Sequence, residues 1–401
     1  MNTPKIRFKG FTDDWEQRKF GEVTKELLDY DNFSSGLPLL TSSRSGLMYQ
    51  SEYRGNATTE NENTLFSVVP LNACTYRHMS DDSTFHLNIN TLEKGLVSKE
   101  YPVFQENESN LKFIVQYINS SNSFTKFCTE QKKGGTRTRL YYKTLCEYKL
   151  MMPSIKEQNK TANFFDTLDH LITLHQRKCD ETKQLKKFML QKMFPKNGEK
   201  NPEIRFEGFT DDWEQRKLGE VSSKITKKNQ DIVVDEVFTN SAEYGIISQR
   251  DFFDKDIANF ENIDGYYIVE PNDFVYNPRI STTAPFGPIK RNKLERTGAM
   301  SPLYYVFRPH DIDLSYLECF FQTSCWHTFM RFNGNTGARS DRFAITDKVF
   351  DEMPISMPQD IEEQQKIGSY FSSLDNLITL HQRKCEKLKE LKKFMLQNMF
   401  V

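Results

Sequence analysis

The sequence predicts an α+β protein in which two mixed α/β domains are separated by two long antiparallel coiled-coil helices, with an internal pseudo-twofold repeat. Two observations predict this architecture. A block that opens each half of the chain is repeated, from Pro4 to Val23 and from Pro202 to Val221, with 17 of 20 positions identical. A second block closes each half, in residues 164–194 and 370–400, with 22 of 31 positions identical. A period of about 200 residues is too long for a solenoid and indicates a duplicated domain pair.

The closing blocks are predicted to form the long helices. Their apolar residues recur in steps of three and four, and no Gly or Pro interrupts residues 156–194. Pro153 and Pro358 stand just upstream, where helices begin. Such a helix is about 55 Å long, too long to be buried against one compact domain, so its own copy is the expected partner. The predicted coiled-coil seam comprises Leu168, Leu171, Leu185, Met189, Leu374, Leu377, Leu391 and Met395.

The segments between the blocks are predicted to be mixed α/β domains with much strand. Runs rich in Tyr, Val, Ile and Phe predict strands in 265–280 and 301–309, with weaker counterparts in 65–78 and 96–105. The predicted divisions are a first domain, a first long helix, a second domain and a second long helix, in residues 1–152, 153–196, 197–355 and 356–401. We infer that the nearly constant blocks do a common job and that the divergent inserts do different ones.

Composition excludes several classes of protein. The formal net charge is −1, so only a local cluster of charge can mark a nucleic-acid partner. The seven cysteines are scattered without a C-x-x-C pair, which disfavours a disulfide framework or a zinc site. His175 and Cys179 are therefore expected to pack in the seam. No apolar run approaches the roughly 20 residues that span a bilayer, and the N-terminus lacks the core of a signal peptide, so a cytoplasmic protein without membrane contact is expected.

Catalytic motifs are missing from the sequence. It contains no G-x-x-x-x-G-K-[ST] loop, no G-x-G-x-x-G, no H-E-x-x-H and no G-x-S-x-G elbow. No catalytic residue, metal ligand or cofactor of this chain is predicted. The carboxylates Asp13 and Asp14 are expected to serve a turn or helix cap. Beside them, Trp15 and its copy Trp213 are either anchors for a partner or plain core.

Basic, glycine-containing loops precede each long helix. They occupy residues 130–142 and 331–343, and a third basic run, rich in hydroxyls, occupies 277–296. Glycine lets the backbone approach a ligand, and Arg presents a planar fork that grips guanine or phosphate. The alternative is an ordinary surface turn, but recurrence at corresponding positions favours binding. The predicted DNA-binding residues are Lys132, Lys133, Arg137, Arg139, Arg279, Thr282, Thr283, Lys290, Arg291, Arg331, Arg339 and Arg342.

Together these features resemble the specificity subunit of type I restriction-modification enzymes over the whole chain. The resemblance rests on "GFTDDWEQRKFGEV" and "GFTDDWEQRKLGEV", on the "LITLHQRKC...LKKFMLQ" helices, and on "DFVYNPRIS...GPIK...GAMSPLYYVFRP", which looks like a target-recognition domain. It implies a non-catalytic subunit whose two target-recognition domains each read half of a split double-stranded DNA site. It also implies two methyltransferase (modification) subunits, which hold S-adenosylmethionine for adenine methylation, and restriction/translocase subunits, which use ATP and Mg²⁺. The first domain departs more from the pattern than the second.

The resemblance makes the long helices a ruler. B-DNA repeats every ~34 Å, so helices of about 55 Å are expected to place the readers one to two turns apart, with an unread gap between. Two alternatives remain open at this point. The chain could itself be a nuclease or methyltransferase, which would require a metal cluster or cofactor loop, or it could be a coiled-coil protein-interaction scaffold without sequence-specific DNA reading.

Overall fold

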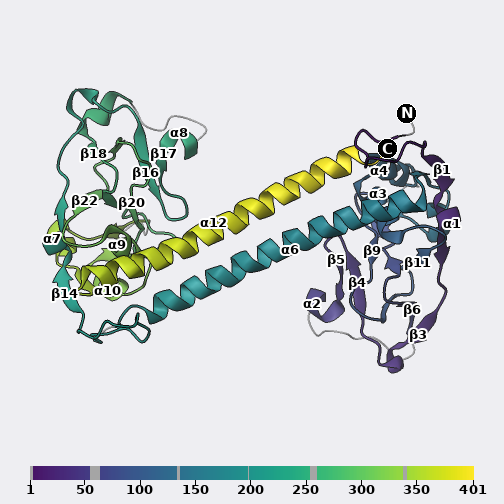
Figure 1. Ribbon diagram of the computed structural model, residues 1–401, viewed down its shortest axis with the longest axis horizontal. Helices are drawn as coiled ribbons and strands as arrows, with labels where there is room; N and C mark the ends of the chain where they lie inside the picture. The colour runs from purple at the N-terminus through teal and green to yellow at the C-terminus, as the bar shows by residue number, and fades with distance from the viewer. Residues whose placement is uncertain (1–2, 55–63, 133–135, 197, 253–259, 337–340) are drawn as a thin grey trace. The chain divides into compact units, whose positions relative to one another are not determined.

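The computed structural model of the chain describes residues 3–54, 64–132, 136–196, 198–252, 260–336 and 341–401. These residues form two compact units, one of Met1–Gln176 with Arg383–Val401 and the other of Arg177–Gln382. Each unit contains one mixed α/β domain and a stretch of both long helices (Figure 1). The predicted α+β class and its internal repeat are confirmed. In the described part of the chain no helix is long and apolar enough to cross a membrane.

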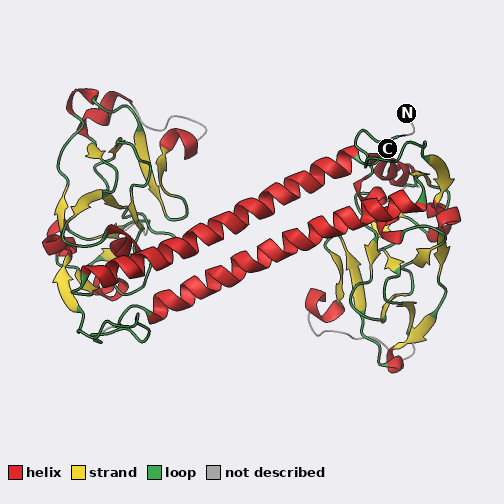
Figure 2. Cartoon of the chain, in the orientation of Figure 1, coloured by secondary structure: helices red, strands yellow, loops and turns green. Residues whose placement is uncertain are grey.

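The first domain is built on an antiparallel sheet of order β2-β11-β7-β9, with a second sheet, β10-β6-β3, and the hairpin β4-β5 (Figure 2). Its core packs Phe104 of the first sheet with Phe113 and Phe124 of two helices. Its strands are β1 (Glu16–Lys19), β2 (Thr24–Glu26), β3 (Tyr30–Asn32), β4 (Leu40–Ser43), β5 (Gly46–Tyr49), β6 (Leu65–Val69), β7 (Cys74–Thr75), β8 (Met79–Ser80), β9 (Asn88–Ile89), β10 (Gly95–Ser98), β11 (Val103–Glu106), β12 (Thr138–Arg139) and β13 (Lys149–Met152). Its helices are α1 (Phe20–Val23), α2 (Gln50–Arg54), α3 (Leu111–Ser120), α4 (Asn122–Glu130) and α5 (Tyr142–Leu145).

The second domain repeats this plan with sheets of order β15-β22-β19-β20 and β17-β16-β21-β18. Strands occur in all four segments where the sequence predicts them. The strands of the second domain are β14 (Glu214–Lys217), β15 (Ser222–Lys224), β16 (Val237–Ser241), β17 (Gly245–Ser248), β18 (Tyr267–Val269), β19 (Phe274–Tyr276), β20 (Ile289–Arg291), β21 (Gly298–Met300), β22 (Tyr305–Pro309), β23 (Asn335–Thr336), β24 (Phe343–Ala344) and β25 (Pro354–Met357). Its helices are α7 (Leu218–Val221), α8 (Gln249–Phe252), α9 (Leu314–Phe320), α10 (His327–Asn333) and α11 (Asp347–Asp351).

The long helices are α6 (Ile155–Lys192) and α12 (Ile361–Asn398), each of 38 residues. In the first unit, Asp169 of α6 meets Lys392 of α12 at 2.6 Å, and the backbone oxygen of Ile172 meets the Cys385 thiol at 3.9 Å. From the first contact to the second, the residue number rises from 169 to 172 in α6 and falls from 392 to 385 in α12, so the two helices pair antiparallel. Positions spaced alternately by three and four form the seam. Along α6 and the residue that follows it they are Phe165, Leu168, Ile172, His175, Cys179, Thr182, Lys186, Met189 and Met193, and along α12 and the residue that follows it they are Phe371, Leu374, Ile378, His381, Cys385, Leu388, Lys392, Met395 and Met399.

Four of the eight predicted seam residues are wrong, namely Leu171, Leu185, Leu377 and Leu391. Leu168, Met189, Leu374 and Met395 lie in the seam, whereas Leu185, Leu377 and Leu391 are 44%, 44% and 42% exposed. The physical reason is that each helix carries a second apolar stripe, in which leucines directly precede seam positions. We call this second set the outer stripe: in α6 it comprises Leu171, Leu174, Leu185 and Phe188, and in α12 Leu377, Leu380, Leu391 and Phe394.

A buried glutamine ties the start of each long helix to its domain. Gln158 donates from its side-chain amide to the Pro153 carbonyl oxygen at 2.8 Å, and Gln364 donates in the same way to Pro358 at 2.8 Å. Both side chains are almost fully buried, at 4% and 2% exposure. Because proline cannot continue a strand ladder or a preceding helix, these contacts set the residue at which each long helix begins.

In the first unit, the opening block joins one end of each long helix. Arg7 donates through Nε and Nη2 to the two carboxylate oxygens of Glu157, in the first turn of α6, at 2.7 and 2.8 Å. The neighbouring Ile6 N–H donates to the carbonyl oxygen of Asn398, the last residue of α12, at 2.9 Å. One short segment therefore fixes where α6 starts and where α12 ends.

The second unit contains the same arrangement with the helices exchanged. Arg205 donates to both carboxylate oxygens of Glu363, in the first turn of α12, at 2.7 and 2.8 Å. The Ile204 N–H donates to the carbonyl oxygen of Lys192, the last residue of α6, at 2.9 Å. We refer to the Arg7–Glu157 and Arg205–Glu363 pairs as the frame clamps.

The last aromatic residue of each closing block enters a domain core. The Phe400 ring lies 5.4 Å from that of Phe113, and the Phe194 ring lies 6.1 Å from that of Trp213. Trp15 packs at 5.7 Å on the same Phe113. Trp15 and Trp213 are 2% and 5% exposed, so both tryptophans belong to the core.

The frame clamps predict a large stability difference between two arginines of the second unit. Arg205→Ala leaves the Glu363 carboxylate buried at 1% exposure without its partner, so the free energy of unfolding should fall by about 3–5 kcal/mol. Arg216→Ala removes a partly exposed ion pair with Glu220 and a hydrogen bond to the Glu220 carbonyl oxygen, and should cost about 1 kcal/mol or less. Urea unfolding of the two variants measures both values, and equal losses would contradict the role of the clamp.

Candidate nucleic-acid interface

In the first domain, the basic loop before α6 forms a two-stranded ribbon with the segment that follows β7. Strands β8 and β12 pair antiparallel, with Arg139 opposite Met79. The Leu140 N–H donates to the His78 carbonyl oxygen at 2.9 Å and extends the pairing. Beside it, the buried hydroxyls of Ser83 and Thr138 lie 2.6 Å apart. These bonds hold the backbone of the ribbon while the Arg139 side chain is exposed.

The second domain has a ribbon at the corresponding place. Arg279 and Arg342 lie opposite each other in an isolated antiparallel bridge. The Phe343 N–H donates to the Pro278 carbonyl oxygen at 2.8 Å, matching the bond of Leu140 to His78. Both arginines are exposed, and within the described residues neither guanidinium has a hydrogen-bond or ion-pair partner. The sequence predicted both arginines as site residues, and the structure brings them together.

Asn277 and Gly287 hold the backbone of the second ribbon in place. Asn277 donates from its amide to the Asn240 carbonyl oxygen at 2.8 Å and accepts from the Arg279 N–H at 2.9 Å. Gly287 has φ +85, and a Cβ at that position would lie 2.0 Å from the Asn277 carbonyl oxygen. Only glycine allows this approach, which explains the "GPIK" motif of the second domain.

A hydroxyl-bearing turn follows the second ribbon. The Ala284 N–H donates to Ser281 Oγ at 3.1 Å, and the Ser281 and Thr283 hydroxyl oxygens lie 3.3 Å apart. Ser281, Thr282 and Thr283 are exposed. Short hydroxyl side chains of this kind serve as phosphate contacts, which keeps the predicted Thr282 and Thr283 as candidates.

Two predicted contact residues, Lys290 and Arg291, are less accessible than the arginines of the ribbons. The Arg291 guanidinium donates to Asn272 Oδ1 at 2.9 Å through Nε and lies 3.8 Å from a carboxylate oxygen of Glu318. Lys290 is largely desolvated, and burial lowers the pKa of its ammonium group. The Arg291 guanidinium is therefore occupied between the sheet and α9, whereas the half-buried Lys290 stays a prediction. Sequence alone does not show the partners, because Glu318 is distant along the chain.

The remaining predicted cations occupy several places. Arg137 forms a surface pair with Asp81 at 2.8 Å. Lys132, after α4, and Arg331, in the last turn of α10, are exposed and lie outside the ribbons. Lys133 and Arg339 lie outside the described residues. Arg139 in one domain and Arg279 with Arg342 in the other are the predicted cations that lie on the ribbons, and a contact of any of the predicted cations with DNA stays a prediction.

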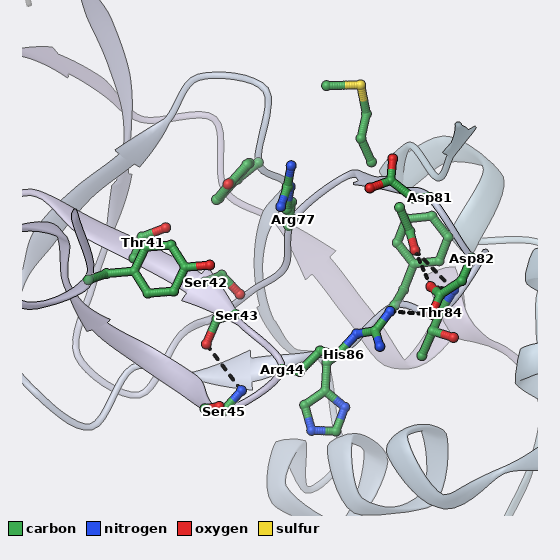
Figure 3. Close-up of a pocket in the computed structure, with 15 residues that line it drawn as sticks. Thr41, Ser42, Ser43, Arg44, Ser45, Arg77, Asp81, Asp82, Thr84 and His86 are labelled. Carbon is green, nitrogen blue, oxygen red and sulfur yellow. Dashed lines mark hydrogen bonds and ion pairs between the residues drawn. The ribbon is translucent and has the colours of Figure 1, made fainter. Parts of the chain in front are cut away.

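Sequence reasoning missed a polar pocket beside the first ribbon (Figure 3). It is lined by Arg44, Arg77, Asp82 and His86, and also by both residues of β8. Hydrogen bonds from Arg44, Ser80 and the Thr84 N–H hold the pKa of the Asp82 carboxyl well below its usual range. Burial lowers the pKa of His86, so its imidazole is neutral at pH 7. The signal in the sequence was Tyr76, which aligns with Tyr276 and so makes Arg77 the equivalent of Asn277.

Other reactive chemistry is scarce in the described part of the chain. It contains no group of three or more His, Cys, Asp or Glu side chains that could hold a metal ion. Burial raises the pKa of Cys128 to about 12 and that of Cys319 to about 12. Thiols of this kind remain protonated at neutral pH and are poor nucleophiles.

Comparison with known protein families identifies the class of protein. Residues 79–184 and 210–390 match the type I restriction modification DNA specificity domain, so the matched segments cover parts of both domains and both long helices. The chain belongs to this family, and the scaffold alternative is not favoured.

The chain is similar to solved structures to different degrees, and the first of them shares its fold. The S subunit of the type I restriction-modification system from M. genitalium matches 100% of this chain over 99% of its own length, with a TM-score of 0.61 at 12% identity. The HsdS subunit from Thermoanaerobacter tengcongensis matches with a TM-score of 0.43 at 15% identity, covering 96% of each chain. A structure concerned with complex assembly and conformational transition of the type I R-M system matches with a TM-score of 0.45 at 14% identity, covering 97% of this chain and 98% of its own. No curated protein matches the chain.

Proposed function

We propose that this chain is the DNA-specificity subunit of a type I restriction-modification complex in which each domain reads one half of a bipartite double-stranded DNA site. The chain itself is non-catalytic in this proposal. Two methyltransferase subunits supply adenine methylation with S-adenosylmethionine, and restriction/translocase subunits use ATP and Mg²⁺. The observation that carries the proposal is the presence of an exposed arginine ribbon at the same place in both domains.

The chemistry of the ribbons fits recognition of base edges. A two-stranded ribbon is narrow enough to enter the major groove, where an arginine fork pairs with the O6 and N7 atoms of guanine. Arg139, Arg279 and Arg342 are exposed on rigid, hydrogen-bonded backbone. The hydroxyls of Ser281 and Thr283 stand beside the second ribbon, as expected of groups that position a protein on phosphates.

Net charge supports a division of labour with the partners. Affinity for DNA at physiological salt grows with the number of phosphates that a protein neutralises. A chain of net charge −1 can contribute little of that non-specific attraction. We therefore expect weak binding by the isolated chain and tight binding once the methyltransferase subunits add their own basic surfaces.

The outer stripe supports docking of the methyltransferase subunits on the long helices. Leu185 and Phe188 in the second unit are 44% and 48% exposed, and Leu391 and Phe394 in the first unit are 42% and 53% exposed. Each pair is one helical turn long and repeats exactly in sequence, which a helix from a partner can use as apolar anchors. Two copies of one surface accommodate two copies of one partner.

Methylation mapping tests the function. Co-expression with a cognate methyltransferase subunit and single-molecule sequencing of host DNA should reveal a split motif with two short half-sites. Arg139→Ala should relax one half-site and Arg342→Ala the other, because each good arginine–base pair contributes about 1–3 kcal/mol of discrimination. The matched control is Arg216→Ala, which removes a partly exposed arginine of the opening block away from the ribbons and should change neither half-site. An intact complex whose variants all methylate like the wild type would refute reading by the ribbons.

Docking through the outer stripe makes a stoichiometric prediction. Leu185→Ser with Phe188→Ser should reduce the number of bound methyltransferase subunits from two to one, because burying each large apolar side chain contributes about 1.5–3 kcal/mol. Leu391→Ser with Phe394→Ser should do the same, and the combined variant should bind none. Native mass spectrometry measures the ratio, with Gln184→Glu as the exposed control in the same helical turn. Unchanged ratios in all variants would place the docking surface elsewhere.

The ruler proposed for the long helices is tested by insertion. Seven residues that continue the seam pattern are added after Leu185 in α6 and after Asp375 in α12, so that the pairing of Lys186 with Asp375 is kept. One heptad adds about 10.5 Å of helix, close to three base pairs of B-DNA. The unread gap in the methylation motif should lengthen while both half-sites stay the same. Altered bases in either half-site would contradict a purely spacing role.

A further inference from the structure

The polar pocket of the first domain contains one arginine that the rest of the pocket does not neutralise. The cavity has a volume of about 430 Å³ and borders the first ribbon through Met79 and Ser80. Its charged groups come from separate strands and loops, so their pairing follows from tertiary structure. That pairing decides which side chain is available to a ligand.

Both carboxylates of the pocket already have arginine partners. Asp81 pairs with Arg137 at 2.8 Å, and Asp82 pairs with Arg44 at 2.5 Å. Asp82 also accepts from the Ser80 hydroxyl at 2.8 Å, so its position is held from two directions. Among the described residues, the guanidinium of Arg77 has neither a hydrogen-bond nor an ion-pair partner, and its side chain is exposed to the pocket.

The backbone at Arg77 is rigid although its side chain is unpaired. The residue before it, Tyr76, is 0% exposed and donates from its hydroxyl to the Leu140 carbonyl oxygen at 3.1 Å. The residue after it, His78, is 4% exposed and accepts from the Leu140 N–H at 2.9 Å. Two bonds to Leu140 therefore hold the backbone on either side of Arg77 to the ribbon, so binding through Arg77 does not have to order that backbone.

We propose that Arg77 is a specificity-determining residue of the first domain and reads a guanine in the major groove of its half-site. This inference rests on the proposed function. The arginine fork matches the O6 and N7 acceptors of guanine in a bidentate geometry. A phosphate contact is the alternative role for Arg77, and the Lys variant distinguishes the two, because lysine keeps the charge that a phosphate needs and lacks the fork that a guanine needs. A G·C pair presents acceptors to Arg77 and a donor, the cytosine amino group, to the carboxylate side.

The second domain differs at this position in a way that explains divergent half-sites. The bonds of Leu140 to His78 and of Phe343 to Pro278 place Asn277 where the first domain has Arg77. Asn277 is 9% exposed, and its side-chain amide donates a hydrogen bond to the Asn240 carbonyl oxygen. One domain therefore presents a free guanidinium where the other presents a closed hydrogen-bonded support.

The test is methylation mapping of the complete complex with Arg77→Ala and Arg77→Lys. DNA methylated by the wild-type complex should show a split motif. The half-site that changes in Arg342→Ala is the one read by the second domain. In Arg77→Ala, one guanine of the other half-site should become degenerate, with discrimination falling roughly 10- to 100-fold. Arg77→Lys should lose most of the same discrimination, since lysine keeps the charge without the fork.

Each alternative has its own outcome. A phosphate contact by Arg77 predicts that Arg77→Ala lowers methylation at all sites without changing the motif and that Arg77→Lys restores it, and this result would overturn the proposal. An unchanged motif and level in both variants would overturn it as well. A wild-type complex that yields no split motif would instead reject the proposed function. Where Arg77→Ala does not purify with its partner, Arg77→Gln keeps a polar side chain without the charged fork and carries the same comparison.

Discussion

The buried pair between an arginine of the opening block and a glutamate in the first helical turn is the constraint on which the rest of the structure depends. Glu157 and Glu363 are 2% and 1% exposed, and such a carboxylate costs several kcal/mol in free energy unless it is fully paired. The bidentate guanidinium supplies that pairing, and the residue before it bonds the last residue of the other long helix. Two helix ends in each unit thus depend on one short segment, which explains why the opening block is almost identical in its two copies.

The repeated frame could be predicted from sequence to a large extent, but the seam of the long helices only in part. Repetition, the prolines before each helix and the apolar periodicity all have local signatures. The true seam, however, includes the polar residues His175, Thr182 and Lys186, whereas the outer stripe includes Leu171 and Leu185. Hydrophobicity alone therefore favours the wrong stripe. Only the partner helix, with Asp375 placed against Lys186, distinguishes the two.

The candidate interface was predictable as a region and not residue by residue. Basic runs before each long helix pointed to the ribbons, and Arg139, Arg279 and Arg342 are exposed there. Arg291 belongs to the same run as Arg279, yet its guanidinium is occupied by Asn272 and Glu318. Whether an arginine is available is decided by carboxylates that tertiary structure brings close. A local count of charge cannot contain that information.

Backbone hydrogen bonds connect the constant parts of each domain to the positions that differ between the two domains. Backbone atoms make the bonds from Leu140 to the segment after β7 and from Phe343 to the segment after β19. These bonds therefore do not depend on the side chains at positions 77 and 277. Backbone pairing can therefore preserve the position of a reading residue while its chemistry changes, from a free guanidinium in Arg77 to a hydrogen-bonded amide in Asn277. A duplicated domain built in this way can change the bases that it reads without changing the clamps, the seam or the outer stripe.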